Sequence, residues 1–418
     1  MRRLFLHRSS DSQLDASIYV LRRQRPLLQN LQHLTAYFKP HMLRNIGPFL
    51  GPKLLSLTLL LAFEEGAFES MSFLASLKIQ TPSLEHLYVS VSCRLSSVVC
   101  GTVCSLKHLR TLHISNIHLT SECIDNLSVL SSLTELDVTI TEDGLKDAAS
   151  AAGREISFSS LLVLTISTDT WAIANDFCEV YLRPSSLENI IIQVREVPSC
   201  RRLHELFTAM RGHCSLTSLK HIQLCPEMAS YVDSPPDPVL EPNTLRLLFA
   251  FSNLEELNIY TMISFVKVDN ALIKDIASAW PHLGSLALRS FHDSGSTGVT
   301  IDGLLPLASC NSLKVLCIGL DPTIWQMSTS LRPGNGVCNR SLACLRVGKS
   351  PVTDPYAVAS FLSDVFPNLK QISEWEHCSV DEPDILALVE RWELVRNLYH
   401  HFVNIRMQER CWAASADR

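Results

Sequence analysis

Residues 109–114 of the chain are LRTLHI, and this short pattern decides the fold because it recurs. The stretch 84–89 (LEHLYV) precedes it and the stretch 133–138 (LTELDV) follows it, with Leu, Ile or Val at the same places. Eleven clear copies of Leu-x-x-Leu-x-Leu start at Leu54, Leu84, Leu109, Leu133, Leu161, Leu187, Leu219, Leu254, Leu283, Leu313 and Leu342. Weaker copies start at Leu31 and Leu369, and successive starts lie 23 to 35 residues apart. Such an ordered series predicts a chain built by repetition of one structural unit.

Each unit combines a strand pattern with a helix pattern. The Leu-x-Leu half of the hexapeptide alternates with period two, as a strand with one buried face does. Asp354-Pro355 is a helix start, because Asp accepts bonds from the first backbone N–H groups and proline suits the first helical position. Proline then stops helices before the next strand, as in Trp280-Pro281 and Phe366-Pro367. Helical spacing is found at 121–130, 270–280, 301–309 and 354–366.

One such unit buries too few leucines to fold alone, so its stability must come from stacking on its neighbours. The pattern therefore predicts a leucine-rich-repeat solenoid over residues 31–375. Its expected form is an α/β horseshoe with a concave parallel sheet and outer helices. The Asn or Cys that usually follows the strand of such repeats is mostly missing, and Ile117 and Met262 stand at that place in two of them. We therefore expect irregular turns and uneven curvature.

The two ends of the chain have different patterns. Residues 1–30 form a short, polar N-terminal segment. Residues 376–418 are expected to be a capping helix and tail, because 382–412 is amphipathic and a solenoid needs its last apolar face covered. A helix that binds a partner is the alternative. The longest inserts are 148–160 and the proline-rich 226–242, which is either a functional loop or a disordered excursion.

Composition and charge argue against two classes of partner. The formal net charge is -6, and the arginines near the start of the chain do not continue into a basic stripe, so a nucleic-acid surface is not expected. The longest apolar run, 54–63, is about half of the roughly 20 residues that a membrane helix needs. The apolar stretch Leu4-Phe5-Leu6 is too short for a signal peptide. We therefore expect no membrane partner and a cytoplasmic or nuclear location.

The cysteines and the catalytic motifs favour neither a metal site nor an enzyme. Fourteen cysteines are scattered without a Cys-x-x-Cys pair; Cys100 and Cys104 lie four apart, and no histidine spacing near them completes a zinc site. Most are expected to be small buried hydrophobes. His204-Glu205 lacks the second histidine of a zinc-protease helix, and neither a Gly-x-Ser-x-Gly elbow nor a phosphate loop occurs. No metal, no cofactor and no catalysis are expected, although an active site of unfamiliar type stays open.

The candidate binding surface is the concave face of the predicted sheet. Side chains alternate faces along a strand, so the residues between and just after the inward leucines point to that face. Their mixture of polar, aromatic and weakly charged groups suits a protein or peptide partner. The candidates are His86, Tyr88, His113, Glu135, Asp137, Gln193, Gln223, Asn258, Tyr260, Arg289 and Arg346. Many of them are alternatively only solvated strand positions.

The repeats resemble the leucine-rich-repeat region of fungal F-box proteins, especially the large families of mushroom-forming fungi. The resemblance covers about residues 26–375 and rests on PLLQNLQHL (26–34), FLGPKLLSLTL (49–59), TPSLEHL (81–87) and FPNLK (366–370). In those proteins the F-box precedes the repeats, binds a Skp1-type adaptor and places a substrate beside a ubiquitin-conjugating enzyme. The F-box usually opens with Leu-Pro-x-Glu, and nothing in this chain matches it.

Two functions follow from these observations. The resemblance implies substrate recognition for an SCF-type ubiquitin ligase, with a Skp1-type adaptor as partner only if an F-box lies upstream. Either the chain is truncated at its start or the F-box has been lost. The alternative is a standalone scaffold that binds a protein without any link to ubiquitin.

Overall fold

The computed structural model describes most of the chain. The described residues are 2–6, 26–38, 46–61, 67–90, 96–145, 157–182, 186–196, 198–226, 239–261, 265–266, 268–290, 298–321, 336–373 and 383–416. They form two compact units. Unit 1 comprises residues 1–195 and 212–215, and unit 2 comprises residues 196–211 and 216–418. Most of the two longest predicted inserts, 148–160 and 226–242, lies outside the described residues, because the structure leaves out 146–156 and 227–238. The end of the second insert is described and contains a short strand, Val239–Leu240.

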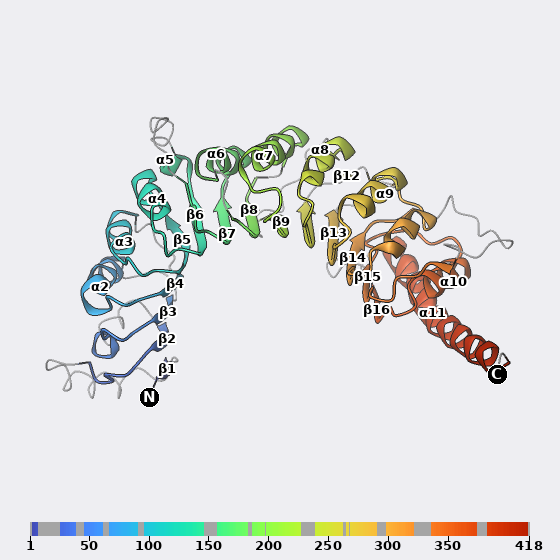
Figure 1. The fold of residues 1–418 in the computed structure, drawn as a ribbon, viewed down its shortest axis with the longest axis horizontal. Coiled ribbons are helices and arrows are strands. Elements are labelled where there is room, and N and C mark those ends of the chain that lie inside the picture. Colours follow the sequence, from blue (N-terminus) through green and yellow to red (C-terminus); the bar gives the residue numbers. More distant parts are fainter. Residues whose placement is uncertain are drawn as a thin grey trace. The chain divides into compact units, whose positions relative to one another are not determined.

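Unit 1 is built on a parallel sheet whose strands follow the order of the chain (Figure 1). Each strand pairs with the next, and all pairs except β5–β6 keep one continuous register. Its strands are β1 (Arg3–Leu6), β2 (His33–Phe38), β3 (Ser56–Leu61), β4 (His86–Ser90), β5 (Thr111–His118), β6 (Glu135–Ile140), β7 (Val163–Thr168) and β8 (Asn189–Val194). The register shifts at one place, between β5 and β6 after Ile114, where a bulge interrupts the pairing.

The helices of unit 1 lie along one side of these strands (Figure 1). They are η2 (Gly47–Phe49), α2 (Ala67–Gln80), α3 (Ser96–Val103), α4 (Ser121–Ser128), α5 (Glu142–Leu145) and α6 (Trp171–Tyr181). Threonines cap two of them, because Thr120 accepts from the backbone N–H of Cys123 and Thr170 accepts from that of Ile173.

The predicted leucines build the core of unit 1. The second Leu of each repeat stands in register with that of the next, and these side chains are no more than 1% exposed. They are Leu34, Leu57, Leu87, Leu112, Leu136, Leu164 and Ile190. Full burial of one such side chain contributes about 1.5–3 kcal/mol. Repetition of this row across the sheet therefore supplies the stability that a single repeat lacks.

Unit 2 repeats the same design. The strands of its parallel sheet are β9 (His221–Pro226), β11 (Glu256–Thr261), β13 (Ser285–Ser290), β14 (Val315–Ile318), β15 (Cys344–Arg346) and β16 (Gln371–Ser373). A second parallel pair joins β10 (Val239–Leu240) to β12 (Phe265–Val266). Its helices are most of α7 (Cys200–His213), then α8 (Pro242–Arg246), η4 (Leu247–Ala250), α9 (Asn270–Ala279), η5 (Asp302–Ser309), α10 (Pro355–Val365) and α11 (Pro383–Ala416).

The long helix α11 packs against α10 and the last strand of unit 2. Trp392, Val395 and Tyr399 are at most 1% exposed. The Trp392 indole N–H donates to the carbonyl of Ser350 at 2.8 Å. The Tyr399 hydroxyl donates to the carbonyl of Phe366 at 2.8 Å and accepts from a backbone N–H at 2.9 Å. These contacts are those expected of a helix that covers the apolar end of a repeat stack.

The predicted helices form where the sequence places them, although one of them has a different geometry, and one strand was not anticipated. The predicted start at Asp354-Pro355 is confirmed, since the Asp354 carboxylate accepts from the N–H of Ala357 at 3.0 Å. The stretch 301–309 forms a 3₁₀ helix with Pro306 inside it, because a proline without an N–H cannot continue the α-helical bonding. Strand β1 was not anticipated: it lies in the N-terminal segment and pairs with β2. The chain is thus an α/β leucine-rich-repeat solenoid with a parallel sheet and flanking helices.

Candidate functional site

The side chains between the buried ladder positions of unit 1 form a separate surface, here called the open face. Along β4, β6, β7 and β8 every second residue is buried and the residues between are partly exposed. Continuous register arranges the open-face residues in rows that cross the strands. One row runs through Ser56, His86, Thr111, Glu135, Val163 and Asn189. The next runs through Thr58, Tyr88, His113, Asp137, Thr165 and Ile191.

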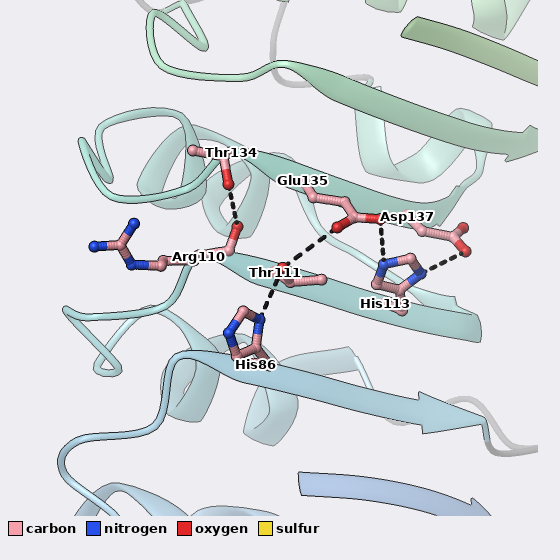
Figure 2. A network of polar contacts seen from close by, with 7 residues as sticks. All are labelled: His86, Arg110, Thr111, His113, Thr134, Glu135 and Asp137. Carbon is pink, nitrogen blue, oxygen red and sulfur yellow. Dashed lines mark hydrogen bonds and ion pairs between the residues drawn. The ribbon is translucent and has the colours of Figure 1, made fainter. Parts of the chain in front are cut away.

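His113 is the centre of a polar network on this face (Figure 2). Its Nδ1 lies 3.2 Å from Asp137 Oδ2, and its Nε2 lies 3.1 Å from Glu135 Oε1. Both carboxylates come from β6, and β5 supplies the imidazole between them (Figure 2). The His113 side chain is 24% exposed and that of Asp137 is 27% exposed, so water screens these contacts only in part.

The network extends to β4 on the other side of His113. The Nδ1 atom of His86 lies 3.0 Å from the Thr111 hydroxyl oxygen, and that hydroxyl donates to Glu135 Oε2 at 3.4 Å. The Tyr88 ring stacks on the His113 ring with a centroid distance of 4.4 Å and an interplanar angle of 23°. These six residues are called the His113 network: His86, Tyr88, Thr111, His113, Glu135 and Asp137.

The two carboxylates change how His113 and Tyr88 ionise. Burial disfavours the charged imidazolium, but the hydrogen bond and negative charge of Asp137, followed by those of Glu135, outweigh it and raise the pKa of His113 above 6.5. Burial, and then the charge of Glu135, raise the pKa of the Tyr88 phenol above 10.0. The tyrosine therefore stays neutral at physiological pH, and the network favours a protonated His113.

We expect the Asp137→Asn substitution to lower the pKa of His113, because it removes the strongest group that favours the imidazolium. A histidine whose folded pKa is raised stabilises the fold fully below its unfolded pKa of about 6.5, and this stabilisation is lost as pH rises through the folded pKa. The substitution should therefore lower stability at about pH 6 more than at about pH 8.5. Imidazole NMR titration and urea unfolding at both pH values measure the two effects.

Asp169→Asn is the control for this experiment. The Asp169 carboxylate also belongs to unit 1, but it pairs with Arg195 at 3.0 Å. We expect this variant to leave the His113 titration unchanged. An unchanged His113 pKa in Asp137→Asn would contradict the pairing in Figure 2.

A hydroxyl, an imidazole and carboxylates in contact could suggest catalysis, but the geometry here does not favour it. The hydroxyl of the network belongs to Thr111, which is only 4% exposed and lies between His86 and Glu135. A nucleophile must reach its substrate, and this oxygen is covered by its neighbours. Within the described residues no group of three or more histidine, cysteine or acidic side chains is placed to hold a metal ion. The network suits recognition through hydrogen bonds, charge and an aromatic ring.

The structure brings together five of the predicted site residues, namely His86, Tyr88, His113, Glu135 and Asp137. Gln193 also lies on the open face, where it accepts a hydrogen bond from the Ser167 hydroxyl at 3.0 Å, two strands beyond β6. It is not part of the His113 network.

The other predicted site residues belong to unit 2. Gln223 stands in register with Asn258, and Tyr260 stands in register with Arg289. Asn258 is only 7% exposed and its amide donates to the Glu256 carboxylate, so its side chain is more buried than a surface contact requires. Arg346 is partly exposed at the end of β15.

Sequence reasoning missed Thr111, which joins His86 to Glu135. The signal was present, because Thr111 occupies the same place in LRTLHI as His86 in LEHLYV and Glu135 in LTELDV. If the residue before the second Leu had been chosen in every repeat, Thr111 would have been among the candidates. Its small side chain hides its role, since only the register of β4, β5 and β6 shows that it lies between two longer partners.

No family model matches the chain, and no curated protein is similar to it. Among solved structures, an internalin (InlF) of Listeria monocytogenes is 11% identical with a TM-score of 0.36, covering 80% of this chain and 83% of that chain. The Rad7–Elc1 complex of yeast is 14% identical with a TM-score of 0.36, covering 81% and 79%. A TLR13–ssRNA13 complex is 15% identical with a TM-score of 0.40, covering 87% and 54%.

Identities this low leave function to be argued from the residues of this chain. Among the described helices, none combines the length and the apolarity needed to cross a membrane.

Proposed function

We propose that the chain is a protein-binding scaffold whose recognition surface is the open face of unit 1. The observation that carries this proposal is the His113 network. It offers a partly exposed aromatic ring, an imidazole and two carboxylates on three adjacent rigid strands. Strands packed on helices hold these groups in fixed positions, so a partner does not have to order them on binding. Aromatic and charged groups of this kind are common among the residues that dominate protein interfaces.

We further propose that the bound protein is a substrate for ubiquitination, with this chain as the recognition part of an SCF-type ligase. The support is the resemblance of residues 26–375 to the repeats of fungal F-box proteins. The chain itself has no sequence that matches the adaptor-binding helices, so a Skp1-type adaptor would bind only through an F-box in a longer form of the protein. A scaffold without a link to ubiquitin is the alternative function.

Affinity purification of the full chain from a fungal lysate, with quantification of the bound proteins, tests both parts. We expect the Tyr88→Ala/Asp137→Ala double variant to recover at least tenfold less of the principal partner, which corresponds to about 1.4 kcal/mol. Ile79→Ala is the matched control, because Ile79 is 77% exposed on helix α2, on the other side of the strands. It should leave recovery unchanged.

The outcomes separate the two proposals. Equal recovery by the double variant and the wild type would reject the open face as the binding surface. A partner that depends on the open face and becomes ubiquitinated by the full-length protein would support the ligase role. Partner binding that is lost in the double variant but is never accompanied by a Skp1-type adaptor or by ubiquitination would support the standalone scaffold.

A further inference from the structure

Three cysteines of unit 1 gather where the end of α3 meets the start of α4. Cys104 Sγ lies 3.9 Å from Cys123 Sγ. Cys100 Sγ lies 3.7 Å from the Thr120 hydroxyl oxygen, which also accepts the backbone N–H of Cys123 at 3.3 Å. Either the Cys100 thiol or the Thr120 hydroxyl can donate in this contact. All three cysteines are free thiols, so the sequence pair Cys100 and Cys104 gains a third member from the next repeat.

The three thiols differ in exposure and in ionisation. Cys123 is 1% exposed and Cys100 is 8% exposed, whereas Cys104 is partly exposed. A hydrogen bond from Cys123, only partly offset by burial, lowers the pKa of Cys100 to about 6, and a hydrogen bond from Cys123 likewise lowers the pKa of Cys104. Its bonds to these two sulfurs raise the pKa of Cys123 itself. Cys123 therefore keeps its proton, whereas the thiolate forms of Cys100 and Cys104 are favoured over those of ordinary cysteines. The thiolate is the reactive form of cysteine.

We propose that Cys104 and Cys123 are a site of reversible thiol oxidation, at which hydrogen peroxide joins the end of α3 to the start of α4 by a disulfide. Cys104 is the first residue to react, because it is the more exposed member of the pair and solvent reaches it. Cys123 is the second, because its sulfur is the one in contact with Cys104. Closing the 3.9 Å separation to a bond of about 2.05 Å takes a shift of about 2 Å, which side-chain rotation and a small helix movement supply.

The chemistry balances in two steps. The Cys104 thiolate attacks one peroxide oxygen, so an S–O bond forms, the O–O bond breaks and hydroxide leaves. Cys104 is then a sulfenic acid. The Cys123 sulfur attacks the Cys104 sulfur, the S–O bond breaks, and the departing hydroxyl takes the Cys123 proton and leaves as water. Two protein thiols are oxidised and one peroxide is reduced to water. A dithiol reductant reverses the reaction by thiol–disulfide exchange.

Other buried cysteines of unit 1 do not share these properties. Burial raises the pKa of Cys178 well above its ordinary value and raises that of Cys214 to about 12. Both are buried in the structure. A buried neutral thiol reacts slowly with peroxide. Cys178 and Cys214 therefore serve as internal controls in the same molecule.

Mass spectrometry of the full chain tests the proposal. Reduced protein is freed of reductant and treated with hydrogen peroxide. It is then denatured in the presence of N-ethylmaleimide, which alkylates the remaining thiols, and digested with trypsin without reduction. Cleavage after Arg94, Lys107, Arg110 and Lys146 leaves Cys100 and Cys104 on one peptide and Cys123 on another. We expect these two peptides to be cross-linked after treatment, and dithiothreitol to separate them. Cys178 and Cys214 should remain fully alkylated.

Single variants assign the cross-link, since two cysteines share one peptide. We expect Cys104→Ser to abolish it and Cys100→Ser to retain it. In Cys123→Ser, dimedone should trap Cys104 as a sulfenic acid. Each variant is checked for a wild-type circular dichroism spectrum. A cross-link that survives in Cys104→Ser, disappears in Cys100→Ser, or never forms while the wild-type protein stays folded would overturn the proposal.

Discussion

Replacement of Trp392 by alanine should cost the protein about 3–5 kcal/mol of stability, through loss of a large buried side chain. The indole is 0% exposed, and its N–H donates to the carbonyl of Ser350 at 2.8 Å. The variant leaves a cavity between α11 and the body of unit 2, and it leaves that carbonyl without its partner. We expect α11 to detach before the rest of unit 2 unfolds. Urea unfolding followed by circular dichroism measures the loss.

Trp412→Ala is the matched control, because Trp412 lies on the same helix and is 67% exposed. An exposed substitution of this kind changes stability by no more than about 0.5 kcal/mol. Equal effects of the two tryptophan variants would show that α11 does not seal the end of unit 2, and would favour its alternative interpretation as a helix that binds a partner.

Asn339→Ala should lower stability by about 2–4 kcal/mol, because it removes four hydrogen bonds that one buried side chain makes to the backbone. Asn339 is 0% exposed. Its amide donates to the carbonyls of Leu307 at 3.3 Å and Cys310 at 2.7 Å. Its oxygen accepts from the backbone N–H groups of Ser341 at 2.7 Å and Leu342 at 3.0 Å. One side chain thus joins the end of η5 to the chain entering β15. Thermal unfolding compared with the wild type measures the effect.

Asn368→Ala provides the control for Asn339. Its amide makes a comparable bond to the carbonyl of Arg340 at 2.8 Å, but that bond is exposed to water. Water replaces an exposed hydrogen bond, so we expect a loss of at most about 0.5 kcal/mol. A difference of less than about 1 kcal/mol between the two asparagine variants would contradict the role assigned to Asn339.

The repeat pattern was enough to predict the fold because each hexapeptide encodes its strand locally. Leu112, Leu136 and Leu164 are buried where the period-two alternation places them. Strand β1 could not be predicted in the same way, since Arg3–Leu6 has no Leu-x-x-Leu-x-Leu pattern and forms by pairing with the edge of β2. Backbone hydrogen bonding along an edge places little demand on side chains.

The candidate site was predictable in position but not in its contacts. Alternation along β4, β5 and β6 selected Tyr88, His113 and Asp137 for the same face. Which of them touch depends on register and rotamer, and neither can be obtained from one sequence. In unit 2 the same reasoning selected Asn258, which is buried. The periodicity predicts on which face of the sheet a side chain lies. It does not predict how far neighbouring segments bury that side chain.

The continuous register of unit 1 also limits the shape of anything that lies along its rows. Neighbouring strands lie about 4.8 Å apart, whereas an extended peptide rises about 3.4 Å per residue. A straight chain laid across the strands therefore falls out of step with the row after one or two positions. The two spacings coincide again only after about seven peptide residues, or about five spacings between strands. Because the two spacings differ, an extended peptide cannot place one residue opposite each successive repeat along the row. A folded surface, whose side chains need not be evenly spaced, is not bound by that restriction.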